Sequence, residues 1–194
     1  EMFNKETVMK SSLTLLALAL ASTSVLAAEE NNWKASAELG AIFTSGNTES
    51  TSIKGKIDVK HELESWSNQY IVDVLLKEDE IENDQGDDET QKTAERYFAS
   101  AQGNYKLGTE GSSLFVYGSH TDDKFGGIAK YTTLSAGYGQ HLYKTEKSLL
   151  KADIGPGYVW GEQADGTSVN SGIVRLSADY RLEINDYATF TQAL

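Results

Sequence analysis

Hydrophobic and polar side chains alternate along residues 33–63, in two runs separated by a short polar segment. In the first run the odd positions are apolar and the even positions, apart from Ile42, are polar or small, the odd ones being Trp33, Ala35, Ala37, Leu39, Ala41 and Phe43. The second run keeps the odd-numbered apolar pattern from Thr51 to Leu63. Because successive side chains of a strand point to opposite faces, the pattern predicts two β-strands, each apolar on one face. Each is long enough to cross a bilayer as a tilted strand, which takes about 9–11 residues.

The segment Ser45-Gly46-Asn47-Thr48 between the two runs predicts a tight hairpin, because Gly and Asn tolerate the positive φ of such loops. The odd-numbered residues of both strands share a face only if each odd-numbered residue lies opposite another odd-numbered one. The sequence numbers of two paired residues then add to an even number, so the loop between the strands must hold an odd number of residues. We therefore predict a loop over residues 46–48. The resulting pairs are Phe43 opposite Thr51, Ala41 opposite Ile53 and Glu38 opposite Lys56.

The alternation recurs along the rest of the chain. It predicts strands over residues 69–77, 94–107, 115–122, 133–142, 150–160 and 174–184, and the start of a ninth over 187–194. In the fifth strand, Phe115 and Tyr117 indicate the apolar face, and Gly118, His120 and Asp122 the polar one. Short turns are expected at 64–67, 108–112, 144–147 and 185–186, and longer loops at 78–93, 122–127 and 161–170.

These strands favour a membrane barrel over a soluble sandwich. Sandwich strands usually have about 5–6 residues, whereas most of these are longer, and their polar faces carry charges. Lipid outside and a polar lumen inside account for both features, so we predict an all-β, antiparallel up-and-down transmembrane β-barrel of the bacterial outer-membrane type. Such barrels have even strand numbers and no unpaired edges, so we expect residues 28–194 to be a C-terminally truncated barrel.

The N-terminal residues predict an export signal. Met9 and Lys10 precede an apolar run over residues 13–21, which is well short of the roughly 20 residues that a spanning helix needs. Residues 1–8 resemble an upstream extension, and small residues at Ala27 and Ala28 suit cleavage by a signal peptidase. We therefore expect residues 1–27 to be an extension plus signal peptide, and the mature chain to be exported to the outer membrane.

Composition narrows the chemistry. The chain has no Cys, so it forms neither a disulfide framework nor thiolate metal sites. Its formal net charge of −12 argues against nucleic acid as a partner. No cofactor is expected. The expected partners are outer-membrane lipid and lipopolysaccharide, and the oligomeric state is left open.

An acidic stretch over residues 78–89 is the candidate for cation binding. Its carboxylates at Asp84, Asp87, Asp88 and Glu89 are the oxygen ligands that Ca²⁺ and Mg²⁺ prefer. The spacing does not match an EF-hand, and a run of like charge is usually a solvated loop. We therefore expect an open acidic loop, with divalent cations as a hypothesis and no assigned metal site.

The polar run at Ser119, His120 and Asp122 invites a hydrolase interpretation. Adjacent residues of a strand point to opposite faces, so Ser119 and His120 do not form a nucleophile–base pair. His120 and Asp122 share a face, but this leaves a base without a nucleophile. The sequence thus predicts a protein without catalytic residues.

Charged side chains on the polar faces of the predicted strands are the strongest candidate for a functional cluster. We predict a lumen charge network whose members are Glu38, Lys56, Arg96, Asp153, Arg175, Asp179 and Arg181. Ionised groups inside a narrow barrel must pair or stay hydrated. A filled lumen is favoured over a pore. At Gly155-Pro156-Gly157, where proline lacks a ladder donor, we expect a bulge or bend.

Three segments carry a family resemblance: residues 38–48, Gly155-Pro156-Gly157-Tyr158 and residues 175–180. Together they resemble the YdiY-like salt-induced outer membrane proteins, a domain family of unknown function. The likeness covers essentially all of the mature chain. It implies an outer-membrane β-barrel with no assigned activity. We therefore expect a non-enzymatic barrel with a role in salt or envelope stress, and the alternative is a small porin-like channel for ions or small solutes.

Overall fold

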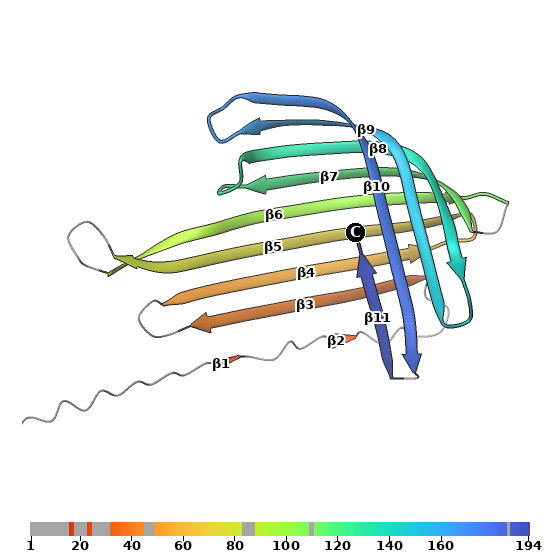
Figure 1. Ribbon diagram of the computed structural model, residues 1–194, viewed down its shortest axis with the longest axis horizontal. Helices are drawn as coiled ribbons and strands as arrows, with labels where there is room; N and C mark the ends of the chain where they lie inside the picture. Colours follow the sequence, from red (N-terminus) through yellow and green to blue (C-terminus); the bar gives the residue numbers. More distant parts are fainter. Residues whose placement is uncertain are drawn as a thin grey trace, which may run out of the picture.

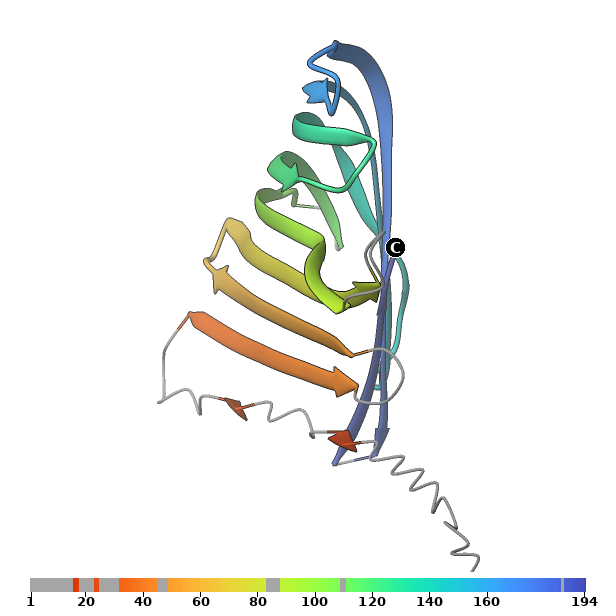
Figure 2. The same cartoon turned by 90° about the vertical axis from the view of Figure 1, so that its left-hand side faces the viewer.

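The fold is one curved antiparallel sheet. The computed structural model describes residues 32–44, 49–82, 88–108, 111–185 and 187–194, and the backbone of 16–17 and 23–24. The long strands are β3 (Trp33–Thr44), β4 (Ser50–Glu62), β5 (Trp66–Glu82), β6 (Asp88–Lys106), β7 (Ser112–Asp123), β8 (Ile128–Lys144), β9 (Ser148–Gln163), β10 (Ser168–Asn185) and β11 (Ala188–Ala193). Each pairs with the strand before it in the chain. Figures 1 and 2 show the sheet curling into a half-barrel, so the predicted all-β, up-and-down fold is confirmed.

Two further strands of two residues each, β1 (Leu16–Ala17) and β2 (Thr23–Ser24), pair with β3. The rest of the predicted signal peptide, residues 1–27, lies outside the described residues. Within the described residues, no helix is long and apolar enough to cross a membrane.

The first hairpin has the predicted register. Phe43 lies opposite Thr51, Ala41 opposite Ile53 and Glu38 opposite Lys56. The ladder continues without a shift from Trp33 opposite His61 to Thr44 opposite Ser50. The parity argument therefore holds along the whole hairpin, although the predicted loop residues 46–48 lie outside the described residues.

The two faces of the sheet differ in polarity. Apolar side chains cover the convex face and stay exposed, as in Leu39 at 67%, Val174 at 69% and Leu176 at 68%. Polar side chains are buried on the concave face, as in Asp153 at 3% and Thr121 at 3%. Because a water-soluble domain buries its apolar face instead, this arrangement is inverted with respect to a soluble sheet protein.

The predicted faces of β7 are wrong. Phe115 lies on the concave face and is 1% exposed, whereas Leu114 and Val116 are on the convex face at 50% and 61%. The register agrees, because Phe115 lies opposite Gly137 and Val116 opposite Ala136. It follows that Tyr117 points inward with Phe115, and that Gly118, His120 and Asp122 point outward.

The predicted long loops are also corrected. Residues 78–82 and 88–92 are not loop but a ladder that extends the β5–β6 hairpin past a bulge at Lys77/Glu78. Backbone pairing does not depend on side-chain charge, and Lys77 relieves the repulsion by an ion pair with Asp79 at 2.7 Å. Likewise, β9 and β10 continue to Gln163 and from Ser168, so the predicted loop over 161–170 shrinks to 164–167.

The sheet bends sharply along β8 and β9, whose ribbons both curve in Figure 1. A Cβ on Gly137 would lie 2.2 Å from the carbonyl oxygen of Ile154, and one on Gly155 would lie 2.2 Å from that of Ala136. Only glycine permits this approach of two backbones. The β8–β9 ladder skips Pro156 and Gly155 but keeps its register on both sides. The expected bend is therefore present, and the expected bulge is not.

We predict that Gly137→Ala destabilises the protein by about 1–3 kcal/mol, because its methyl group would force the β8 and β9 backbones apart. Gly55→Ala is the matched control, because a Cβ there meets nothing within 4 Å. Equilibrium unfolding in urea, followed by tryptophan fluorescence, measures both. Equal stability of the two variants would contradict the close approach.

Candidate functional site

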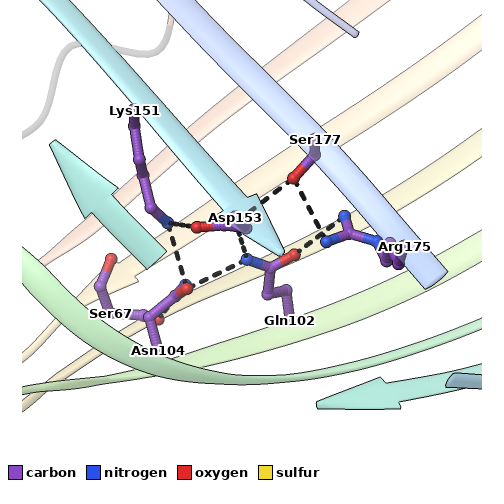
Figure 3. A network of polar contacts seen from close by, with 7 residues as sticks. All are labelled: Ser67, Gln102, Asn104, Lys151, Asp153, Arg175 and Ser177. Carbon is purple, nitrogen blue, oxygen red and sulfur yellow. Dashed lines mark hydrogen bonds and ion pairs between the residues drawn. The ribbon is translucent and has the colours of Figure 1, made fainter. Parts of the chain in front are cut away.

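Polar side chains from three strands meet on the concave face. Figure 3 shows Gln102 and Asn104 on β6, Lys151 and Asp153 on β9, and Arg175 and Ser177 on β10. Strands β7 and β8 lie between β6 and β9 in the sheet, so only strong curvature brings these residues together. Strand β8 contributes small residues beside β9. Gly139 is one of them, since a Cβ there would lie 2.3 Å from Asp153 Oδ1. We call this cluster the interior network.

Asp153 is the centre of the interior network. Its Oδ2 accepts a hydrogen bond from Gln102 Nε2 at 3.0 Å and one from Ser177 Oγ at 3.4 Å. Lys151 Nζ lies 3.3 Å from its Oδ1 and also donates to Asn104 Oδ1 at 3.1 Å. A carboxylate that is 97% buried would be costly without such partners, so these contacts hold the charge in place.

Arg175 explains why two aromatic residues point inward. Its guanidinium donates to Gln102 Oε1 at 3.2 Å and to Ser177 Oγ at 3.3 Å. The same group lies 4.0 Å from the ring centroid of Tyr117 and 5.4 Å from that of Phe115. Such cation–π contacts suit a cation in a partly desolvated site. The aromatic rings of β7 therefore belong to the polar interior.

A second cluster lies closer to the β5–β6 hairpin. Asp73 is 8% exposed and accepts a hydrogen bond from Arg96 Nη2 at 3.1 Å. Lys54 Nζ lies 4.0 Å from its other carboxylate oxygen. These residues come from β4, β5 and β6, which are adjacent in the sheet.

The residues of the predicted lumen network thus divide into separate groups. Asp153 and Arg175 share Gln102 and Ser177, and Arg96 pairs with Asp73. Arg181 pairs along its own strand with Glu183 at 3.0 Å.

The remaining members of that prediction are not joined by ion pairs. Glu38 lies opposite Lys56, and Asp179 opposite Lys151. No ion pair within 4.0 Å is formed by Glu38, Lys56 or Asp179 in the described part of the chain. Asp179 is exposed on the concave side of β10.

Gln102 and Asn104 were not singled out from the sequence. Both fall on the polar face of the strand predicted over residues 94–107. The lumen network was predicted from charged side chains, and the amides of Gln102 and Asn104 are neutral. Their role depends on β9 and β10 lying across from β6, which no local pattern reveals. A buried polar cluster needs both donors and acceptors, and the amides supply them.

The serine and histidine on β7 point to opposite faces. Ser119 is buried at 9% exposure on the concave side. His120 Nδ1 lies on the convex side, 2.8 Å from Thr132 Oγ1. Asp122 contacts Lys130 at 3.8 Å rather than His120. The pairing of His120 with Asp122 is therefore not formed, and His120 points away from Ser119 to the other face of the sheet.

The acidic stretch is only partly described. Asp84 and Asp87 lie outside the described residues, Asp88 begins β6, and Glu89 is exposed. No three His, Asp or Glu side chains approach closely enough to hold a metal ion in the described ranges. In the extended hairpin, the Lys77 ammonium and the hydroxyls of Ser50 and Thr93 lower the pKa of Asp79 to about 2. The carboxylate at the base of this hairpin therefore stays ionised.

Comparison with known proteins places this geometry in a family. The model of the family described as "Protein of unknown function, DUF481" matches residues 37–194, which include β4 to β11, all but the first four residues of β3, and the whole interior network. The chain belongs to this family. This family match agrees with the resemblance to a domain family of unknown function that residues 38–48, 155–158 and 175–180 indicated.

The relative found for this DUF481 protein is "Uncharacterized protein YdiY" of Escherichia coli (strain K12). The two are 25% identical over 155 residues, which cover 80% of this chain and 58% of YdiY. The chain therefore spans a little over half the length of that relative. No solved structure matches the DUF481 chain.

We predict that Asp153→Ala destabilises this DUF481 protein by about 2–4 kcal/mol, because it leaves buried donors of the interior network without their acceptor. Asp179→Ala is the matched control and should change stability by no more than about 0.5 kcal/mol, since Asp179 is exposed. Urea unfolding of both variants measures the difference. If Asp179→Ala lowered the free energy of unfolding as much as Asp153→Ala, the interior network would not account for the effect of Asp153→Ala.

Proposed function

We propose that this DUF481 protein is a non-enzymatic β-barrel protein of the bacterial outer membrane, with an interior filled by polar side chains. The observation that carries the proposal is the apolar convex face, which is exposed along every long strand from β3 to β10. Exposed apolar area of this extent is unfavourable in water but favourable against acyl chains. Strands β4 to β9 are each paired on both sides within the sheet, so their backbone groups are hydrogen-bonded as a hydrocarbon environment demands.

The height of the apolar band supports the same environment. Trp33 and Phe43 mark the two ends of the convex face of β3 and are ten residues apart. At about 3.4 Å per residue and a tilt of about 45°, they are separated by about 24 Å across the membrane, close to the band of about 25 Å in outer-membrane barrels.

Aromatic rings gather at both edges of the band. Trp33 stacks on His61 with ring centroids 3.8 Å apart, and Trp66 meets Tyr105 edge-on at 5.3 Å. At the other edge, Tyr158 and Trp160 lie 6.2 Å apart. Aromatic side chains with one polar atom suit the boundary between lipid and water.

The proposed orientation places the end with Trp33 and the short turns in the periplasm. The N-terminal signal expected over residues 1–27 is consistent with export. The acidic β5–β6 hairpin then extends beyond the outer surface, where divalent cations can bridge its carboxylates to anionic lipopolysaccharide. A role in salt or envelope stress is the physiological setting that we propose, from the resemblance to the YdiY-like family.

The alternative function is a small channel, which two cavities on the concave face favour. One of about 380 Å³ is lined by Lys106, His141 and Lys151, and one of about 390 Å³ by Lys54, Lys56 and Arg96. The interior network contributes Lys151 and Asn104 to the first cavity and no residue to the second. Discrete conductance steps in planar bilayers would favour the channel over the filled barrel.

We expect the full chain, expressed in a Gram-negative host, to fractionate with the outer membrane and to need detergent for extraction. A lumen-facing variant, Ser177→Ala, should behave the same. Recovery of the chain in the soluble periplasmic fraction would contradict the proposal.

A further inference from the structure

One cavity on the concave face has the composition of a binding site. Its volume is about 390 Å³, and it is lined by Lys54, Lys56, Ile71, Asp73, Arg96, Phe98, Thr121 and Tyr131. These residues come from five consecutive strands, β4 to β8, and none of them belongs to the interior network. The cavity is therefore a separate feature of the concave face.

The charges around the cavity do not cancel. Lys54, Lys56 and Arg96 face a single carboxylate, Asp73. Asp73 is already engaged by Arg96 at 3.1 Å and by Lys54 at 4.0 Å. Lys56 has no hydrogen-bond or ion-pair partner in the described part of the chain. The residues that line the cavity thus comprise three cations and one carboxylate, and Glu38, which lies opposite Lys56 on β3, forms no ion pair with it.

Two buried donors that belong to cavity residues have no partner in the described structure. They are Arg96 Nε and Thr121 Oγ1, and Thr121 is only 3% exposed. A buried polar group without a hydrogen bond destabilises the folded state, so such groups usually have a partner. An acceptor oxygen inside the cavity would satisfy both.

The remaining wall is apolar. Ile71 and Phe98 line the cavity beside the cationic groups. Inorganic anions would leave this surface in contact with water, whereas an anion with a hydrocarbon part would cover it. Small-molecule sites commonly combine such a wall with a few fixed polar groups.

We propose that this cavity binds a small organic carboxylate. The carboxylate oxygens accept hydrogen bonds from Lys56, Arg96 Nε and Thr121 Oγ1, and the hydrocarbon part packs against Ile71 and Phe98. This assignment goes beyond the proposed function. It also does not depend on that function, because the lining residues lie on the concave face, whereas the membrane proposal rests on the convex face.

The probe is benzoate, added to the full chain folded in a non-ionic detergent and followed by calorimetric titration at low salt. Benzyl alcohol has the same ring without the charge, and acetate has the charge without the ring. We expect benzoate to bind at least tenfold more tightly than either. A charge-assisted hydrogen bond of typical strength accounts for a factor of this size.

Two variants locate the site. Lys56→Gln removes the unpaired cation and should weaken benzoate binding about tenfold, and the near-isosteric Thr121→Val should weaken it several-fold. Lys60→Gln is the matched control, because Lys60 lies four residues farther along β4 on the same face and does not line the cavity. It should leave the affinity unchanged.

Three results would overturn the proposal. Absence of any benzoate binding at millimolar concentration would show that the cavity holds only water. Equal affinity for benzyl alcohol would show an apolar site without anion recognition. Equal weakening by Lys60→Gln and Lys56→Gln would show diffuse attraction to the concave face. Loss of the membrane location alone would leave the cavity proposal standing.

Discussion

Pairing of every long strand with its neighbour in the sequence is the constraint on which the structure depends. It makes the side-chain alternation of one strand continuous with that of the next, so all the convex positions form one surface and all the concave positions another. The first hairpin sets this relation through pairs such as Glu38 with Lys56. A shift by one residue within the first hairpin would put charges among the apolar side chains, and a shift that the sheet does contain, at Lys77/Glu78, lies in the acidic extension of the β5–β6 hairpin.

Curvature then decides what the concave face can hold. Gly137 and Gly155 let two backbones approach, and the sheet folds over along β8 and β9. This fold brings β9 and β10 across from β6, which allows Gln102 to bridge Asp153 and Arg175. The interior is therefore held together by hydrogen bonds and ion pairs, and loss of one of these contacts is costly because the groups are buried.

Local alternation predicted the strands, their order and the register of the first hairpin, because these follow from side-chain period and loop parity alone. It failed at Phe115, since hydrophobicity assigns an aromatic ring to the apolar face, whereas Arg175 holds it inside. It also failed at the acidic hairpin, where backbone pairing continues despite the charge. The role of Gln102 required contacts between residues more than fifty positions apart, which no local pattern contains.

Site-directed labelling tests most directly whether the convex face contacts lipid. The chain has no Cys, so single cysteines can be placed at Ser52, Lys54 and Lys56 on the concave face of β4 and at Ile53, Gly55 and Ile57 on its convex face. In liposomes, a water-soluble maleimide should label the concave positions and leave the convex ones unmodified until detergent is added. Equal labelling of both sets in liposomes would contradict the account.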